Sequence, residues 1–389
     1  METSELFSMM ANGEDSRHQF KGDINNAASL GAEMVAFSNS KGGFLLIGVN
    51  DDGSFSGLTQ DDISRLNQII SNAASQNVRP PISPLTENMT LPDGIVIIVH
   101  IEQGISKPYM DTNGYIWVKK GADKRRVMAR EEMQRLFQEA ALVHADELPV
   151  RGSSIADVDP DYFSTCFESI VGESLSIQSL PLAKLMENMN LMKEGQLNIC
   201  GALLFASKPQ LRLPVFIVKT VAFPGVEITD IHYIDSQDIN GKLSDIFQKT
   251  LGFVLSNIRY VQNEQSFNSV GEPEIPRIVF EELIANALIH RDYFISAPVR
   301  VLIFSNRIEI VSPGHLPNNL TVENIKLGNS NVRNPILASF APKLLPYRGL
   351  GSGILRALKA YPDIDLIDDR DGNIFKAIIK RHQYSQEVN

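Results

Sequence analysis

The most constraining feature of the sequence is an alternation of helical spacing with short apolar runs that end at glycine turns. Residues 27–39 place apolar side chains at i, i+4 and i+7, which predicts a helix. The continuous apolar run 44–49 follows a glycine break and ends at Asn50-Asp51-Asp52-Gly53, which predicts a buried strand entering a tight turn. Further buried strands are predicted at 95–101 and 115–118, with helices at 63–74 and 129–144. The N-terminal part is therefore expected to be α/β.

Later segments repeat this alternation. Helices are predicted around 160–172, 182–190, 242–258, 277–290 and 353–360, and strands at 202–205, 215–221 and 375–379. The runs 299–304 and 307–311 are joined by Ser305-Asn306, which predicts a β-hairpin.

Length and composition indicate several domains in a soluble protein. The chain has 389 residues, of which 43% are apolar and 21% charged, whereas single hydrophobic cores stop growing well before this length. The stretch 145–161 loses periodicity and gathers Pro, Gly, Ser and Asp, which predicts a linker. We therefore expect an α/β and α+β multi-domain protein with a domain at 8–144, a linker at 145–161, a middle α/β region at 162–270 and a C-terminal domain at 271–382.

Charge and cysteine content exclude some classes of function. The formal net charge is -10, which argues against coating nucleic acid through bulk positive charge but allows a local basic patch. Cys166 and Cys200 have no partners at metal-ligand spacing, so neither a zinc site nor a disulfide framework is predicted. The sequence shows no apolar signal segment or membrane span, and a cytoplasmic protein with no membrane partner is expected.

The predicted helix 277–290 carries polar residues on one face. Glu282, Asn286 and His290 recur at i, i+4 and i+8. A carboxylate and an amide one turn apart suit a nucleotide site, because the amide oxygen can hold Mg²⁺ and the carboxylate can orient or deprotonate water. A solvated helix face is the alternative for so short a pattern.

Four blocks in the second half resemble a known family. They are residues 280–293 (FEELIANALIHRDY), 307–317 (RIEIVSPGHLP), 330–335 (SNVRNP) and 349–354 (GLGSGI). In this order they are similar to the RecG-related helicase C-terminal or GHKL-type ATPase domain, over roughly residues 180–382. The resemblance implies a GHKL-like α/β sandwich that binds ATP with Mg²⁺.

The resemblance also implies roles for individual residues. Glu282 matches the general-base position and Asn286 the Mg²⁺-binding position, while His290 and Arg291 belong to the nucleotide pocket. Gly349, Gly351 and Gly353 would lie at the phosphates, and Gly314 belongs to the adenine loop.

One departure from the family concerns this adenine loop. Ordinary GHKL ATPases place Asp before its first glycine, whereas this chain has Ser312-Pro313-Gly314. Nucleotide binding without fast hydrolysis is therefore an open alternative to a slow ATPase. Helicase activity is excluded as an expectation, because the sequence has no GxxxxGK[ST] phosphate loop.

The N-terminal block resembles a second family. Residues 33–53, with Gly57-Leu58 and Lys107-Pro108-Tyr109 downstream, look like the Schlafen-type AlbA domain of bacterial transcriptional regulators. This resemblance implies a mixed sheet with helices that binds nucleic acid.

Some Schlafen relatives cut RNA with three acids that hold a divalent metal. Glu14 matches the first acid, and Asp51 or Asp52 could supply the third, but Gln19 stands where the second is expected. A simple turn is the alternative role for Asp51 and Asp52.

A basic cluster contrasts with the acidic total. Six cations lie within twelve residues: Lys119, Lys120, Lys124, Arg125, Arg126 and Arg130. Tyr115 and Trp117 lie just before them and could stack on bases. The alternative is a solvated loop leading into a helix, with Trp117 in the core.

Together these observations favour a regulator that binds ATP and nucleic acid, DNA or RNA, in which the nucleotide state modulates the N-terminal domain. A homo-oligomer is expected. Two alternatives remain: a metal-dependent Schlafen-like nuclease of a defence or toxin system, and an interaction scaffold with a degenerate nucleotide site.

Overall fold

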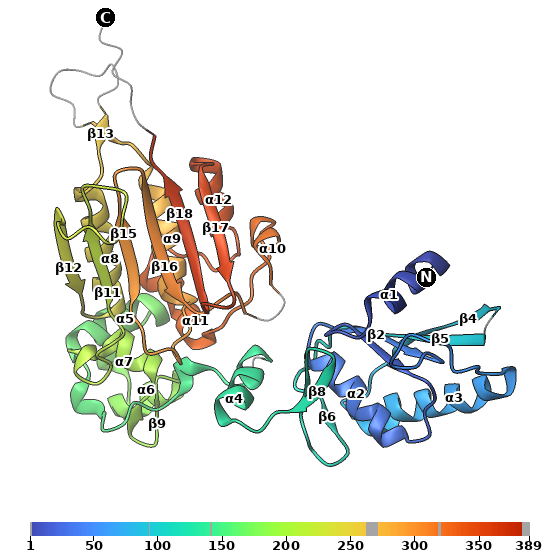
Figure 1. Cartoon of the computed structure of the whole chain (residues 1–389). Helices are drawn as coiled ribbons and strands as arrows, with labels where there is room; N and C mark the ends of the chain where they lie inside the picture. The colour runs from blue at the N-terminus through green and yellow to red at the C-terminus, as the bar shows by residue number, and fades with distance from the viewer. Residues whose placement is uncertain (1, 93, 141, 262–270, 318–319, 383–389) are drawn as a thin grey trace, which may run out of the picture. The chain divides into compact units, whose positions relative to one another are not determined.

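The computed structural model describes residues 2–92, 94–140, 142–261, 271–317 and 320–382. The chain divides into two compact units, Met1–Val143 (unit 1) and His144–Asn389 (unit 2), which are coloured blue to teal and green to red in Figure 1. The fold is mixed α/β, with helices and several sheets in which parallel and antiparallel strands occur.

Unit 1 is built on a four-stranded sheet of order β1-β2-β5-β4. Its strands are β1 (His18–Lys21), β2 (Gly43–Ile47), β4 (Leu85–Leu91) and β5 (Gly94–Ile101). Strand β1 is parallel to β2, and the other neighbouring pairs are antiparallel. The helices are α1 (Thr3–Asn12), α2 (Ala27–Asn39), α3 (Gln60–Asn72) and α4 (Arg130–Glu139), with a π-helical turn at Ala73–Asn77. Two antiparallel ribbons pair β3 (Val78–Arg79) with β6 (Met110–Asp111), and β7 (Trp117–Lys120) with β8 (Asp123–Arg126).

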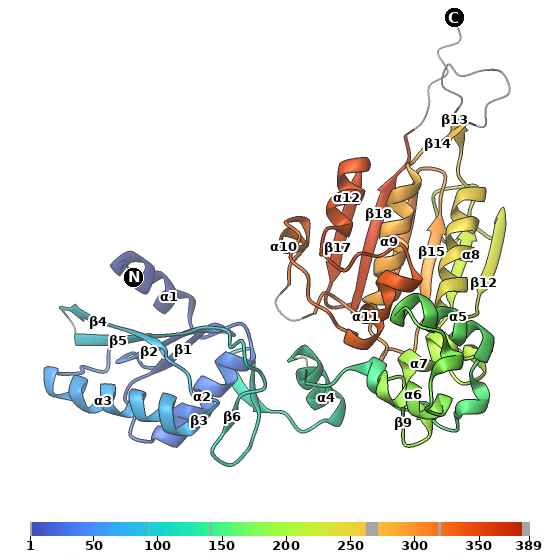
Figure 2. The same ribbon diagram turned by 180° about the vertical axis from the view of Figure 1, so that it is seen from behind.

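The sheet of unit 1 is covered on both faces, which explains why its two central strands, β2 and β5, are continuous apolar runs. Leu45 and Ile47 face a core shared with α2 and α3, whereas the intervening Leu46 faces a core shared with α1. This alternation follows from the two-residue side-chain period of a strand. Helix α1 and the pair α2 and α3 accordingly lie on opposite sides of the sheet (Figure 2).

Unit 2 is built on a six-stranded sheet of order β12-β11-β15-β16-β18-β17. Its strands are β11 (Val218–Ala222), β12 (Asp235–Ile239), β15 (Val299–Ile303), β16 (Arg307–Pro313), β17 (Ile364–Asp369) and β18 (Ile374–Lys380). Only the pair β11 and β15 is parallel among these strands of the described chain. Short ribbons pair β9 (Met192–Lys193) with β10 (Gln196–Leu197), and β13 (Tyr260–Val261) with β14 (Glu272–Pro273).

Three helices cover one face of this sheet (Figures 1 and 2). They are α8 (Leu243–Ser256), α9 (Arg277–Ile289) and α12 (Gly353–Ala360). The remaining helices are α5 (Pro160–Val171), α6 (Leu182–Asn188), α7 (Ile199–Phe205), α10 (Val322–Lys326) and α11 (Pro335–Leu344). Helix α9 is buried on nearly all sides after its exposed first residue, Arg277, so it lies at the centre of the unit and its Glu282 has little contact with water.

The predicted division between a middle region and a C-terminal region needs correction. Strand β11 comes from the first region and pairs with β15 of the second, so both regions contribute to one sheet. The predicted linker 145–161 also belongs to unit 2, because Ala145, Val150 and Val158 are buried in the same core. Its polar residues instead serve short turns and caps: the Asp159 carboxylate, for example, accepts a hydrogen bond from Tyr162 N at the start of α5.

Most predicted elements of secondary structure are confirmed, among them the helices at 27–39 and 353–360 and the hairpin of β15 and β16. The predicted strand 202–205 is wrong, because this segment lies in α7. Every residue of α7 is buried, and a short helix buried all round has the same apolar run as a buried strand. Asn198 caps this helix by accepting a hydrogen bond from Gly201 N at 2.7 Å.

Candidate functional site

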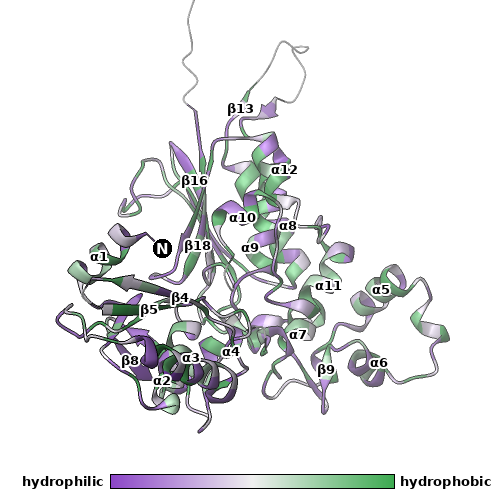
Figure 3. Cartoon of the chain, turned by 90° about the vertical axis from the view of Figure 1, so that its right-hand side faces the viewer, coloured by the Kyte–Doolittle hydropathy of each residue, from purple (hydrophilic) through white to green (hydrophobic). Residues whose placement is uncertain are grey.

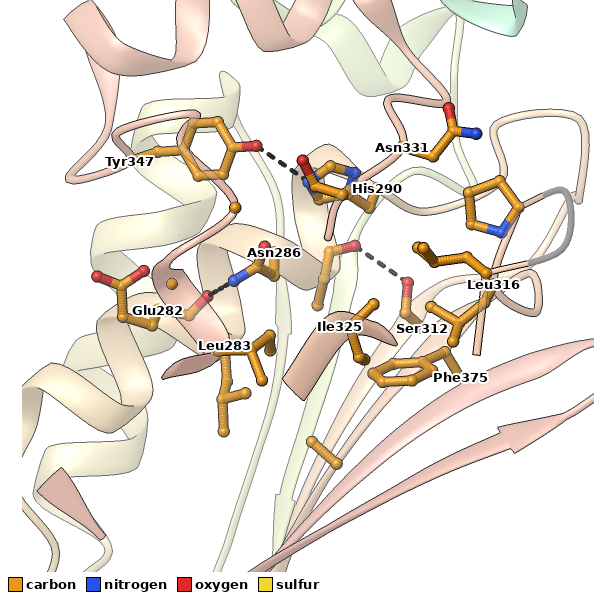
Figure 4. Close-up of a pocket in the computed structure, with 18 of the residues that line it drawn as sticks. Glu282, Leu283, Asn286, His290, Ser312, Leu316, Ile325, Asn331, Tyr347 and Phe375 are labelled. Carbon is orange, nitrogen blue, oxygen red and sulfur yellow. Dashed lines mark hydrogen bonds between the residues drawn. The ribbon is translucent and has the colours of Figure 1, made fainter. Parts of the chain in front are cut away.

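A pocket in unit 2 lies between α9, strands β16 and β18, and the loops around residues 314–317, 329–331 and 347–353. It encloses about 970 Å³, part of which is open to solvent. Figure 4 shows the polar residues of α9 on one side and an apolar wall on the other. Seven of the eight site residues predicted in this half of the chain line it: Glu282, Asn286, His290, Gly314, Gly349, Gly351 and Gly353.

Glu282 is the most buried polar group of the pocket. Its side chain is only 3% exposed and is paired with Arg356 of α12, whose side chain is 28% exposed. Arg356 Nε donates to Glu282 Oε1 at 2.7 Å, and Arg356 Nη1 donates to Ser352 Oγ at 2.9 Å. In the described chain Glu282 Oε2 has no hydrogen-bond partner. The solvated helix face considered from the sequence is therefore wrong for Glu282.

Asn286 lies one turn after Glu282 on α9. Its Nδ2 donates to the main-chain oxygen of Glu282 at 2.7 Å. This bond uses the amide nitrogen, so the amide oxygen is the end of the side chain that remains to accept or to bind a cation.

His290 ends α9 and contacts the loop that follows α11. Its Nε2 lies 3.0 Å from the hydroxyl of Tyr347. Burial, and to a lesser degree the positive charge of Arg333, lowers the pKa of His290 to about 4. The imidazole is consequently neutral at pH 7 and positions Tyr347 without adding a charge to the pocket.

Other atoms closely approach two glycines at the pocket. A Cβ on Gly353 would lie 2.5 Å from Glu282 Oε2, and a Cβ on Gly351 would lie 2.3 Å from the main-chain oxygen of Gly328. Gly351 also has a φ of +69°. The segment that begins α12 therefore presents bare main chain to the pocket, as a phosphate-binding segment does.

The opposite wall of the pocket is apolar and includes Leu316, Ile325 and Phe375 (Figure 4). Ser312 stands at this wall, and its Oγ donates to the main-chain oxygen of Ala287 at 3.1 Å. The hydroxyl proton is thus used within the protein, so Ser312 faces the pocket as an acceptor, which is the role that an adenine amino group requires.

These residues fit a nucleotide with Mg²⁺. The amide oxygen of Asn286 is a hard ligand of the kind that Mg²⁺ prefers, the main chain at Gly351 and Gly353 can approach phosphate oxygens, and the apolar wall can hold a base. Bound Mg²⁺ would neutralise part of the phosphate charge. Asn286 would hold the ion, and Glu282 is the nearest carboxylate on the same helix.

Arg291 was expected in this pocket and does not line it. It is 2% exposed, its Nη2 donates to the main-chain oxygens of Ile295 and Ala297, and its guanidinium carbon lies 4.6 and 4.8 Å from the ring centroids of Phe216 and Tyr293. The sequence places Arg291 directly after His290, but the helix ends there and the next side chain turns into the core.

Arg356 and Tyr347 are two pocket residues with polar contacts that sequence reasoning missed. Arg356 lies three residues after Gly353, so a search of the first turn of the helix that follows the glycines could have found it. No sequence signal marks Tyr347.

The basic cluster of unit 1 forms the β7–β8 hairpin and the start of α4. Strand β8 is strongly hydrophilic (Figure 3). Buried Asn39 of α2 holds the hairpin in place, because its Nδ2 donates to the main-chain oxygens of Tyr109 and Trp117 at 2.8 and 2.9 Å. The hairpin thus replaces the solvated loop considered from the sequence.

Three of the six cations are paired within unit 1. Lys124 pairs with Glu33 and Arg125 with Glu132, while Lys119 Nζ donates to Gln19 Oε1 at 2.6 Å. Burial lowers the pKa of Lys119, although the nearby carboxylates of unit 1 oppose this shift.

The other three cations, Lys120, Arg126 and Arg130, are exposed. The Arg126 guanidinium stacks on Tyr115, with its carbon 3.4 Å from the ring centroid. Trp117 is half-buried, and its Nε1 donates to Asp111 Oδ2 at 2.9 Å, so Trp117 is part of the structure of unit 1 rather than an open stacking surface.

The acids considered for a nuclease have structural contacts. Glu14 Oε1 accepts from Phe20 N at 2.7 Å, and Asp52 Oδ1, in the turn 50–53, accepts from the adjacent Ser54 N at 2.9 Å. Asp51 lies in the same turn and is exposed. Within the described ranges, no group of three His, Cys, Asp or Glu residues is placed to hold a metal ion.

Comparison with protein families agrees with both halves of the chain. Residues 14–128 match the family described as Schlafen, AlbA_2, and residues 296–369 match the family described as putative ATP-dependent DNA helicase recG C-terminal. The chain carries a Schlafen AlbA_2 domain and a RecG-related C-terminal domain. The second match begins after α9 and therefore does not include Glu282 and Asn286. The roles expected of these two residues rest on the geometry of the pocket.

Two solved structures are similar to this chain. The DIP2311 protein from Corynebacterium diphtheriae is 21% identical, with a TM-score of 0.46, over 98% of this chain and 80% of that one. The N-terminal domain of a putative ATP-dependent DNA helicase RecG-related protein from Nitrosomonas europaea is 18% identical, with a TM-score of 0.24, over 33% of this chain and 97% of that one. A comparison with curated proteins gave no match. Among the described residues, no helix is long and apolar enough to span a bilayer.

Proposed function

We propose that this protein is a regulator in which the pocket of unit 2 binds ATP with Mg²⁺ and thereby modulates nucleic-acid binding by unit 1. The observation that carries the nucleotide half is the convergence of Glu282, Asn286 and the glycine segment on one pocket with an apolar wall. The RecG-related family match of residues 296–369 supports an ATPase-like domain.

Nucleic-acid binding by unit 1 is supported by the Schlafen AlbA_2 match and by the exposed cations Lys120, Arg126 and Arg130. Three cations make only a modest electrostatic contribution to nucleic-acid affinity. Each cation that neutralises a phosphate adds roughly one unit or less to the magnitude of the slope of log K, where K is the binding constant, against log salt concentration. Binding through these three cations alone should therefore have a slope near 2 to 3, rather than the value of about 5 expected for six cations.

Calorimetry with Mg-ATP and Mg-ADP tests the nucleotide half. Asn286→Ala should weaken Mg²⁺-dependent binding by at least tenfold, because the variant removes the proposed ion ligand. Arg277→Gln is the matched control, since Arg277 lies on the same helix, is 58% exposed and does not line the pocket. Absence of nucleotide binding by the wild type, or equal binding by wild type and Asn286→Ala, would contradict the proposal.

A salt series of nucleic-acid binding with and without Mg-ATP tests the coupling between the units. Single-stranded and double-stranded DNA and RNA are compared, and nucleotide should change the affinity by a factor of about 5 to 150, the usual range of such couplings. An affinity that is identical with and without nucleotide would remove the regulatory half of the proposal.

A further inference from the structure

The ion pair between Glu282 and Arg356 lies at the pocket and joins α9 to α12. Both members line the pocket, and Arg356 is the more exposed of the two, so a ligand reaches Arg356 before it reaches Glu282. Among the described residues, Arg356 is the only cation in contact with the Glu282 carboxylate.

Glu282 is poorly satisfied even with this partner. Both contacts from Arg356 go to Oε1, whereas Oε2 is buried against Gly353 and has no hydrogen-bond partner in the described ranges. A carboxylate whose charge is held by a single guanidinium is sensitive to any competing anion, because loss of that partner leaves a buried charge uncompensated.

A triphosphate supplies such a competing anion. Phosphate oxygens bind guanidinium groups bidentately, as carboxylates do, and the terminal phosphate carries more charge than a carboxylate. The glycine segment that would bind the phosphates leads directly into the helix that bears Arg356, three residues beyond Gly353.

We propose that Arg356 senses the terminal phosphate of the nucleotide, exchanging its bond to Glu282 for one to that phosphate. This inference rests on the proposed nucleotide site. In the nucleotide-free protein the ion pair holds Glu282 inactive as a base. A triphosphate withdraws Arg356 and leaves the Glu282 carboxylate unpaired beside the bound nucleotide, whereas a diphosphate leaves the pair intact.

The consequence for affinity is a competition that can be measured. In the wild type, part of the attraction between Arg356 and the terminal phosphate is offset by breaking the ion pair. Glu282→Gln removes the competing charge and should tighten ATP binding about tenfold relative to ADP binding. Arg356→Gln should reduce the preference for ATP over ADP to about one.

The test is calorimetry of ATP and ADP binding to the wild type, the two single variants and the double variant Glu282→Gln/Arg356→Gln. Arg356→Gln leaves a buried unpaired carboxylate and could unfold unit 2, whereas the double variant removes both charges and should fold, so it reports the loss of preference in either case. Arg348→Gln, alone and combined with Glu282→Gln, is the matched control, because Arg348 also lines the pocket but is not paired with Glu282.

The result expected is strong coupling between positions 282 and 356 in the ratio of ATP to ADP affinity, and none between 282 and 348. Ratios that stay within about twofold of the wild type in both Glu282→Gln and the double variant would overturn the phosphate-sensing role while leaving nucleotide binding intact. A wild-type protein that binds neither nucleotide would overturn the proposed function and this inference together.

Discussion

Lys124 of the basic hairpin should contribute to the stability of unit 1 and not to nucleic-acid binding. Its partner Glu33 has a side chain that is only 9% exposed, whereas Lys124 is 24% exposed. Glu33 Oε2 has no hydrogen-bond partner in the part of the chain that is described. Lys124→Met therefore removes the counter-ion of a buried carboxylate and keeps most of the apolar stem of the side chain.

The size of the effect follows from this burial. Breaking a fully buried ion pair from one side costs about 3–5 kcal/mol, and the partial exposure of Lys124 reduces the expected loss to about 2 kcal/mol. Lys120→Met is the matched control, because Lys120 lies on the same hairpin and is exposed. Its free energy of unfolding should change by less than about 0.5 kcal/mol.

Urea denaturation followed by tryptophan fluorescence measures this difference. Trp117 is the single tryptophan of the chain, and it lies in β7, so its emission reports the unfolding of unit 1. A loss of 2 kcal/mol should lower the midpoint by about 1 M urea for an ordinary dependence on denaturant. The double variant Glu33→Gln/Lys124→Met should regain most of this loss.

The same variants should show the opposite pattern in nucleic-acid binding. Lys120→Met should reduce the slope of log K against log salt by about one, and folded Lys124→Met should leave it unchanged. Equal urea midpoints for Lys124→Met and Lys120→Met, or a loss of slope in Lys124→Met alone, would refute the assignment of Lys124 to the structure.

Three further predictions concern unit 2. Gly353→Ala should reduce nucleotide affinity at least tenfold in calorimetry while the protein stays folded, because the added Cβ would lie 2.5 Å from Glu282 Oε2 and displace that oxygen. Unchanged affinity would place the phosphates elsewhere. Burial lowers the pKa of His290 from 6.5 in the unfolded chain to about 4 in the folded protein, so between these two pH values the unfolded chain binds more protons than the folded one. The free energy of unfolding should therefore rise by roughly 3 kcal/mol as the pH is raised from 4 to 6.5. His290→Gln should flatten this rise in denaturant titrations at each pH, and an equally steep rise would assign it to other groups. Asp146 is 0% exposed and accepts a hydrogen bond from Leu337 N, and burial raises the pKa of its carboxyl group. Its negative charge therefore opposes folding increasingly as the pH rises above the ordinary pKa of an aspartate. Asp146→Asn should therefore raise the Tm at pH 7 and have less effect near pH 4, and a lower Tm at pH 7 would show that the charge itself is needed.

The sequence predicts features that depend on neighbouring residues. The helix at 27–39 begins at Asn26, whose side chain accepts hydrogen bonds from the first turn, and ends before a glycine pair, so both of its limits are encoded locally. Glu282 and Asn286 could be paired because a helix of known period connects them. The glycine segment 349–353 is likewise visible in the sequence, because its glycines lie close together along the chain.

Features that depend on distant residues could not be predicted. The charge of Lys124 is neutralised by Glu33, 91 residues earlier in the chain, and that of Glu282 by Arg356, 74 residues later. A count of charges in a window cannot include such partners, so six cations appeared available where three are paired. Arg291 was misplaced because a helix end redirects the chain within a single residue.

The pairing of β11 with β15 has a consequence for the order in which the protein forms during synthesis. All strands of unit 1 are complete by Arg126, so this unit can fold while the ribosome is still translating unit 2. One edge of β11 stays unpaired until β15, about eighty residues later, and β16 remains an open edge until β18 emerges near residue 380. A chain stopped before β18 would leave that edge exposed, and it should be an aggregating species attached to an already folded unit 1.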